Sequence, residues 1–297
     1  MLLLNDMKGV ILTNPYDTYS VQQHKVLRMQ QELTALGVDT RVVANDKFVA
    51  GVVNGNIHCQ LNADFVLFFD KDKYTGEMLE KCGVRLFNSA KATAICDDKM
   101  LTHIVLSNHG IPMPDTLPGA LCYNPSGEIS DEYLNQAINR LGLPMVVKQC
   151  YGSYGEQVYL VFTKNELKIL LAEIKTKAYL MQHFEQQSRG RDMRVIVIGG
   201  KAVCAILREN DKDFRSNIAH GGKATAVEIP KTVAEMCEKA ARVIGLDYCG
   251  IDVLLGDKPK ICEVNSNAMF EAMESATGVN VAKLYAEHIV SCVKQAK

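Results

Sequence analysis

Short apolar strands alternate with a helix over the first part of the chain, and this alternation constrains the fold more than any other feature. Apolar residues recur at spacings of three and four between positions 26 and 36, which predicts a helix. Apolar runs of strand length occupy residues 9–13, 38–43, 65–69 and 84–87. Strands separated by helical segments are typical of an open, mostly parallel sheet, so we expect an α/β fold.

A different organisation follows. A helix expected over residues 98–109 must end near Gly110, because the prolines at 112 and 114 cannot continue it. Strands are predicted at 145–149, 157–161 and 179–184, with a helix that begins at the capping box Thr163 to Glu166. Two hairpins come next, with strands at 194–198 and 202–207, then at 250–255 and 260–265. A second capping box, Thr232 to Glu235, predicts a helix between the hairpins, and another helix covers about 279–295.

Composition narrows the classes of function. The 297 residues are 47% apolar and 23% charged, which is typical of globular proteins. The 33 basic and 34 acidic residues give a net charge of −1, and only 7% are aromatic, so we expect no nucleic-acid partner. No run of 18 apolar residues and no apolar leader is seen, so we expect a cytoplasmic protein with no membrane partner. The ten cysteines lie at least twelve positions apart, which disfavours a zinc site.

The second hairpin carries the strongest chemical signal. Its expected four-residue loop is centred between Asp257 and Lys258, so Asp252 and Glu263 face each other on adjacent strands. Asn265 shares their face of the sheet. Facing carboxylates destabilise a sheet, and two carboxylates with an amide oxygen suit a hard cation such as Mg²⁺. The alternative is a hairpin whose acidic residues face water.

A glycine-rich turn, Gly152-Ser153-Tyr154-Gly155, joins two predicted strands. It does not open a helix, so it fits neither the Rossmann fingerprint nor the Walker loop. A turn of this kind can lay its backbone N–H groups over phosphates. Lys148 lies in the preceding apolar strand, where a buried ammonium needs an anionic partner. The alternative is an ordinary tight hairpin with an exposed lysine.

Arginines gather around the first hairpin. Arg194 and Arg208 flank its open end, with Arg191 before them and Arg215 after them. Arginine side chains suit phosphate and carboxylate oxygens. The alternative is a set of surface ion pairs with the nearby acids Asp192, Glu209, Asp211 and Asp213.

These features occur in the order typical of a known family. The chain resembles an ATP-grasp carboxylate–amine ligase of the RimK type, a group that includes glutamate ligases and lysine-biosynthesis ligases. The resemblance covers about residues 98–282 well and the first part only in outline. The matching stretches are Asp98-Lys99, Val147-Lys148 with the glycine-rich turn, Gln182-His183-Phe184, Asp213-Phe214-Arg215-Ser216-Asn217, and Glu263-Val264-Asn265-Ser266-Asn267 followed by Ala276-Thr277-Gly278-Val279-Asn280.

The resemblance implies an α/β ATP-grasp fold in three parts. These are a pre-ATP-grasp parallel-sheet domain over 1–97, a small α+β lid subdomain over 98–184 and a larger α+β catalytic subdomain over 185–297. ATP would lie between the last two. The implied roles are phosphate contacts from Lys99, Lys148, Gly152, Ser153, Arg215, Ser216 and Asn217, an adenine hinge at Gln182, His183, Phe184 and Glu185, a ribose contact from Asp192, one or two Mg²⁺ ions (or Mn²⁺) on Asp252, Glu263 and Asn265, and catalytic roles for Arg208 and Arg215.

The reaction implied by the resemblance has two steps. A carboxylate of an amino acid or peptide, with glutamate as one candidate, attacks the γ-phosphate of ATP to give an acyl phosphate and ADP. An amine then displaces phosphate and forms an amide. We expect small-molecule or peptide co-substrates, and a homo-oligomer because these are common among soluble proteins.

One stretch departs from the family. A Pro-Gly pair usually begins three residues after the asparagine that matches Asn265, and here Ala268-Met269 stand there. That loop would lie near the acceptor amine, so an acceptor different from that of the best-known members is expected and no substrate is named. Two alternatives stay open. They are a non-catalytic ATP-binding regulatory module of this fold, and another ATP-grasp ligase of the D-alanine–D-alanine type.

Overall fold

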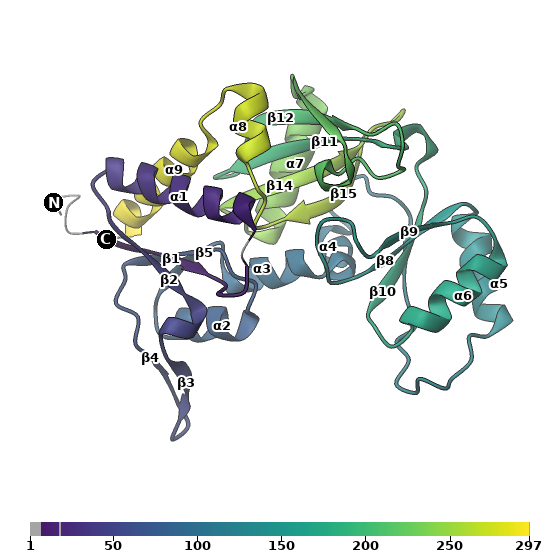
Figure 1. The fold of residues 1–297 in the computed structure, drawn as a ribbon, viewed down its shortest axis with the longest axis horizontal. Helices are drawn as coiled ribbons and strands as arrows, with labels where there is room; N and C mark the ends of the chain where they lie inside the picture. Colours follow the sequence, from purple (N-terminus) through teal and green to yellow (C-terminus); the bar gives the residue numbers. More distant parts are fainter. Residues whose placement is uncertain (1–6, 18, 297) are drawn as a thin grey trace.

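A parallel sheet forms the first part of the molecule in the computed structural model, which describes residues 7–17 and 19–296. Its strand order is β2-β1-β5-β6, which confirms the expected parallel arrangement. The strands are β1 (Lys8–Thr13), β2 (Asp39–Ala44), β5 (Phe65–Phe68) and β6 (Arg85–Phe87), and the helices are α1 (Ser20–Ala35), α2 (Lys73–Lys81) and α3 (Ala90–Asp97). A ribbon of β3 (Ala50–Val53) and β4 (Asn56–Cys59), which the sequence did not predict, projects from this part (Figure 1).

A four-stranded antiparallel sheet, β7-β10-β8-β9, forms the central part. It consists of β7 (Thr116–Pro118), β8 (Met145–Gln149), β9 (Val158–Val161) and β10 (Tyr179–His183), with α5 (Asp131–Leu141) and α6 (Lys164–Ile174). Met145 and Val147 pack against the two helices. Because side chains alternate along a strand, Lys148 lies on the opposite face. The Thr163 cap of the predicted capping box is confirmed, since the Glu166 N–H donates to Thr163 Oγ1 at 3.2 Å, but the Glu166 carboxylate accepts from the Phe162 N–H rather than from that of Thr163.

The third sheet has the order β13-β12-β11-β14-β15 and is antiparallel. Its elements are β11 (Arg191–Ile198), β12 (Lys201–Glu209), β13 (Lys223–Val227), β14 (Tyr248–Leu254) and β15 (Lys260–Asn265), with α4 (Lys99–Leu106), α7 (Lys231–Ile244), α8 (Glu271–Thr277) and α9 (Val281–Ala296). One face packs on α3, α4 and α7. The other face packs on α1, α8 and α9, so the first and third sheets share a hydrophobic core (Figure 1). Short 3₁₀ turns span Asn45–Lys47, Gln186–Ser188 and Ile218–His220.

Three local predictions were wrong. The helix expected over 98–109 ends at Leu106, because Asn108 and Gly110 adopt positive φ angles of 62° and 66°. The second capping box does not form. The N-cap of α7 is Pro230, so Thr232 falls inside the first turn, and no side chain in the described part of the chain caps this helix. The loop of the second hairpin has five residues rather than four, because Leu254 pairs with Lys260.

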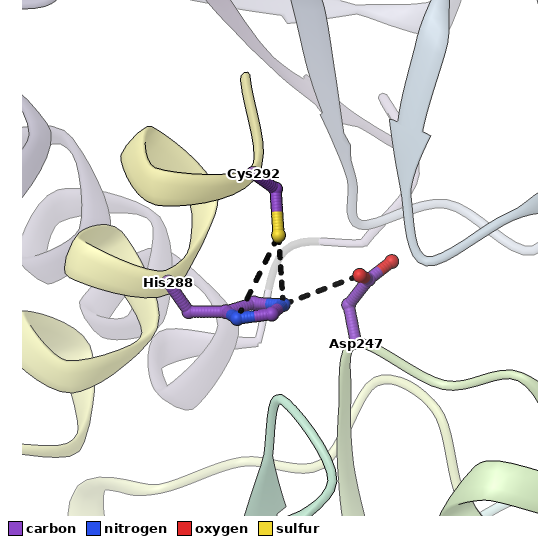
Figure 2. Close-up of side chains that lie close together, drawn as sticks. All are labelled: Asp247, His288 and Cys292. Atoms are coloured by element: carbon purple, nitrogen blue, oxygen red, sulfur yellow. Dashed lines mark hydrogen bonds and ion pairs between the residues drawn. The ribbon is translucent and has the colours of Figure 1, made fainter. Parts of the chain in front are cut away.

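The first and third sheets also meet at a polar cluster outside the shared core. Asp247 accepts two hydrogen bonds of 2.9 Å from Arg85 and lies 3.2 Å from His288 Nε2. Figure 2 shows the Cys292 sulfur close to the same ring, 3.8 and 3.6 Å from Nδ1 and Nε2. These side chains could bind a metal ion, but the contacts that the structure shows join Arg85 of the first sheet to Asp247, which precedes β14 of the third sheet. We therefore assign the cluster to sheet-to-sheet contact.

None of the helices in the described part of the chain is both long enough and apolar enough to cross a bilayer.

Candidate active site

A cavity of about 470 Å³ lies where the three sheets meet, and it collects the residues predicted from the sequence. Every predicted site residue lines it. The lining includes Lys99, Lys148, Gly152, Ser153, Gln182, His183, Phe184, Glu185, Asp192, Arg208, Arg215, Ser216, Asn217, Asp252, Glu263 and Asn265, together with Ala268 and Met269. The structure thus brings together segments that are more than 160 positions apart in the chain.

A row of charged side chains crosses the third sheet at the floor of this cavity. Asp252 pairs directly with Glu263, as predicted, and its other neighbour is Arg194 on β11. Arg194 binds both oxygens of Asp252, at 2.6 and 2.7 Å. Arg208 binds both oxygens of Asp192, at 2.7 and 2.5 Å, and lies 3.0 Å from Asp252. Asp252 is only 4% exposed, so the alternative of an acid facing water is wrong for this residue.

The predicted pairing of Asp252 and Glu263 depends on two features that cancel. The five-residue loop shifts the register by one position, and a bulge between Asp252 and Val253 shifts it back, leaving Cys262 unpaired. The bulge therefore restores the alignment that a symmetric four-residue loop would give. It also directs Cys262 into the cavity beside Lys148, with the sulfur 3.2 Å from Nζ.

The donor set fits a hard divalent cation. Burial disfavours a charge on Asp252, but Arg194 and Arg208 outweigh burial and lower the pKa of this carboxyl, so it is ionised at neutral pH. Glu263 lies 3.6 Å from the Lys99 ammonium. The Asn265 amide nitrogen is buried and has no hydrogen-bond partner within the described residues. Because an amide can be turned by 180°, this position can hold the amide oxygen toward a cation.

Lys148 is a buried ammonium without a carboxylate partner. It is 8% exposed, and its Nζ donates to Gln182 Oε1 at 2.8 Å. Among residues 7–17 and 19–296, no carboxylate lies within 4.0 Å of Nζ. Burial opposes its charge, but attraction from Cys262, Glu263 and Asp252 outweighs burial and raises the pKa of Lys148. The alternative of an exposed lysine is therefore wrong, and an anionic ligand would complete the site.

Gln182 orients Lys148 through a second layer of hydrogen bonds. Its Nε2 donates to Thr116 Oγ1 at 2.9 Å and lies 3.2 Å from His103 Nε2. Burial and the charge of Lys148 lower the pKa of His103 to about 4, so its ring is neutral and accepts this bond. The side chain of Gln182 is thus committed to the lysine. Next to it, Phe184 packs edge-on against Phe214.

The glycine-rich turn is held by two cationic side chains from outside the central sheet. Lys99 Nζ donates to the Gly152 carbonyl at 2.8 Å, and Arg215 Nη1 donates to the Gly155 carbonyl at 2.7 Å. The φ angle of Gly155 is +78°, which favours glycine. A Cβ there would also lie 3.2 Å from Asn217 Oδ1. Arg215 is paired with Asp213, so the surface ion pair proposed as its alternative is present alongside the contact with the turn.

Sequence reasoning missed several polar residues of the cavity. Arg194 was noted only as one of a cluster, yet it holds Asp252. It lies two residues after Asp192, on the same face of one strand, and that spacing was the available signal. Lys71, in the loop after β5, binds Asp97 at 2.7 Å and Ser153 Oγ at 3.3 Å. No local pattern indicated Lys71, because it lies in a loop whose path the sequence does not predict.

The sequence was also compared with models of known protein families. The model of the RimK-like ATP-grasp domain matches residues 96–289. The chain belongs to the RimK-like ATP-grasp family. It has the ATP-grasp fold and is an ATP-dependent carboxylate–amine ligase, as the sequence resemblance implied.

Individual relatives agree with this assignment. Beta-citrylglutamate synthase B of Homo sapiens is 31% identical over 273 residues, which cover 86% of this chain and 69% of that protein. A probable alpha-L-glutamate ligase of Psychromonas ingrahamii is 36% identical over 219 residues, which cover 72% of this chain and 70% of that protein. The crystal structure of D-alanine–D-alanine ligase from Bacillus anthracis with ATP has a TM-score of 0.73 at 17% identity and covers 98% of both chains. That likeness concerns the fold.

Proposed function

We propose that the chain uses Mg²⁺ and ATP to join a carboxylate to the amine of an amino acid through an acyl phosphate, releasing ADP and phosphate. The observation that carries the proposal is the cavity itself. It combines Lys148, a buried ammonium with no carboxylate partner among the described residues, with two carboxylates and an amide on one sheet face. We retain the division into 1–97, 98–184 and 185–297 as the three functional parts.

Asp252, Glu263 and Asn265 would hold Mg²⁺, which, when bound, would neutralise phosphate charge during transfer. Lys148 and Lys99 would bind phosphate oxygens from the central part. Lys148 is already oriented by Gln182, so little rearrangement is needed when ATP enters. The backbone of the glycine-rich turn would cover the phosphates from the other side.

In the first step, an oxygen of the substrate carboxylate attacks the γ-phosphorus of ATP, and the bond to ADP breaks. Negative charge spreads over the transferring group, and cationic side chains stabilise that charge. Arg208 suits this role, because its bonds within the described residues use Nε and Nη2 and leave Nη1 for a ligand. The carboxylates of Asp192 and Asp252 fix the orientation of this guanidinium.

In the second step, the amine attacks the acyl carbon, phosphate leaves, and the amine proton passes to solvent. Water would compete by hydrolysing the acyl phosphate. The glycine-rich turn limits this side reaction when it is held closed by Arg215 and Lys99.

Glutamate is the proposed amine. Both curated relatives described above have glutamate in their names, one joined to a citryl group and one as the ligated amino acid. Only the first of those names includes a group joined to glutamate, so we propose glutamate as the shared co-substrate and leave the carboxylate to experiment.

A coupled assay of ADP release tests the proposal. The protein is incubated with Mg²⁺, ATP and L-glutamate, with citrate, free amino acids or short peptides as carboxylates. Release that requires both a carboxylate and an amine is expected, together with a product mass equal to the sum of both minus water. Tight binding of Mg²⁺ and ATP with no release from any pair would instead favour a regulatory ATP-binding module. Release with D-alanine alone would favour the other ligase class.

A further inference from the structure

The loop over residues 266–269 forms one wall of the cavity, directly after β15. This is the stretch in which Ala268 and Met269 replace the usual Pro-Gly pair. Three buried side chains donate to its successive carbonyl oxygens. These are Asn88 Nδ2 to Ser266 O at 2.8 Å, Lys25 Nζ to Asn267 O at 3.2 Å and Tyr248 Oη to Ala268 O at 2.9 Å. Side chains thus fix a loop that lacks the rigidity of proline.

Lys25 is the least expected of the three donors. It lies on α1, is 1% exposed, and also donates to Asn267 Oδ1 at 2.5 Å. Its ammonium stands 4.0 Å from the ring centre of Phe69. Within residues 7–17 and 19–296, no carboxylate lies within 4.0 Å of Nζ. Burial lowers the pKa of Lys25 to about 7. Attraction from Asp17 opposes this effect, and repulsion from Lys71 adds to it. A buried charge of this kind is costly for the fold.

The same face of α1 carries a second costly polar group. Gln22 lies one helical turn before Lys25, and its Nε2 donates to the Phe69 carbonyl at 3.3 Å. Its Oε1 is buried and has no partner within the described residues. Gln22 and Phe69 both line the cavity, as does Asn267. Apolar side chains at these two buried positions would make the fold more stable. Polar side chains that are kept at such positions are typical of functional sites.

The contact joins distant parts of the chain. Lys25 and Asn267 are 242 positions apart. Lys25 also precedes the segment that matches the family model, which begins at residue 96. Figure 1 shows α1 running beside α8 and α9. The bond from Lys25 to Asn267 connects this helix to the loop after β15. The first part of the chain therefore supports a cavity wall that is formed by the loop directly after the third sheet.

We propose that Lys25 is a positioning residue that holds the 266–269 loop in place, and that this loop, with Gln22 and Phe69, shapes the pocket for the amine co-substrate. The identity of the ligand rests on the proposed function. The anchoring of the loop does not, and it is tested separately.

Hydrogen exchange measured by mass spectrometry tests the anchoring without any substrate. Lys25→Met keeps the aliphatic stem and removes the charge and both hydrogen bonds. Exchange in the peptide that contains 266–269 should become about tenfold faster, the factor that one hydrogen bond to a charged group is worth. The Tm should not fall, because a costly buried charge is removed. The control is Arg28→Met, on the same helix, which removes an ion pair to Glu274 of α8 but no bond to the loop. Unchanged exchange at 266–269, or a lower Tm with faster exchange throughout, would overturn the proposal.

Kinetics test the link to the amine. With L-glutamate as the probe, Lys25→Met should raise its KM about tenfold and leave the Kd for ADP within twofold of wild type. Asn267→Ala should have little further effect in the Lys25→Met background, because both changes break one contact. An unchanged KM, or an equal loss of ADP affinity, would refute the pocket assignment. If the wild-type protein shows no amine-dependent turnover, the proposed function fails, and the exchange experiment still decides the role of Lys25.

Discussion

Replacing Lys148 by methionine tests whether the buried ammonium waits for phosphate. Methionine keeps most of the side-chain volume in the apolar strand β8 and removes the charge. The ammonium contacts Gln182 and Cys262 at 2.8 and 3.2 Å, and no carboxylate of the described residues lies within 4.0 Å of it, so a phosphate would be its first oxyanion partner at hydrogen-bonding distance. A hydrogen bond to a charged group contributes about 1.5–3 kcal/mol. The Kd for ADP should therefore rise about 10- to 100-fold.

Isothermal titration calorimetry with ADP and Mg²⁺ measures this change directly. The matched control is Lys201→Met on β12, where the lysine side chain is 77% exposed and outside the cavity. The control should bind ADP as tightly as wild type. A Kd for Lys148→Met within twofold of wild type, with circular dichroism showing an intact fold, would remove Lys148 from the nucleotide site and refute the argument from burial.

Three further predictions concern the cation, the loop and a buried histidine. Glu263→Gln should lower Mg²⁺-dependent ADP release about 100-fold or more, with little loss of Tm because the ion pair of Glu263 with Lys99 is long, at 3.6 Å; full activity would exclude Glu263 as a ligand. Gly250→Ala would place a Cβ 2.6 Å from Ala268 Cβ, so thermal denaturation should show a loss of about 1–3 kcal/mol. Gly51→Ala, in open space, should be neutral. The pKa of His103 is lowered from 6.5 to about 4, so the unfolded chain is protonated first as the pH falls. Stability should then decrease by up to about 3 kcal/mol between pH 6.5 and 4, and His103→Gln should remove that dependence in urea titrations.

The parts of the site that lie within one hairpin or one strand were predictable. Asp252 was expected to face Glu263 from the position of the turn, and it does so because the bulge offsets the longer loop. Lys148 was recognisable as a charge inside an apolar strand, and its burial confirms that reading. Both features involve residues that are close to one another along the chain.

Contacts between strands that are not consecutive were not predictable in the same way. Arg194 contacts Asp252 because β11 pairs with β14. The elements between them in the sequence, β12, β13 and α7, give no indication that these two strands are neighbours in the sheet. Lys25 meets Asn267 only after two sheets have packed on a common core. Such contacts depend on long-range topology, which residue spacing does not encode.

The two capping signals in the sequence differed in how well they predicted a helix start. Thr163 caps its helix because it is the residue at the helix boundary. Thr232 has the same spacing to a glutamate, but that helix already begins at Lys231 with Pro230 as its N-cap, so Thr232 lies inside the first turn. The pattern alone does not show which of two competing start signals prevails.

An oxygen-isotope experiment tests the acyl-phosphate mechanism most directly. The carboxylate that supports ADP release is labelled with ¹⁸O, and phosphate from a single turnover with Mg²⁺, ATP and L-glutamate is analysed by mass spectrometry. The account predicts one carboxylate-derived ¹⁸O atom in each phosphate, because the carboxylate oxygen that attacks the γ-phosphorus leaves with it. Amide formation with unlabelled phosphate would contradict an acyl-phosphate intermediate and, with it, the roles proposed for this cavity.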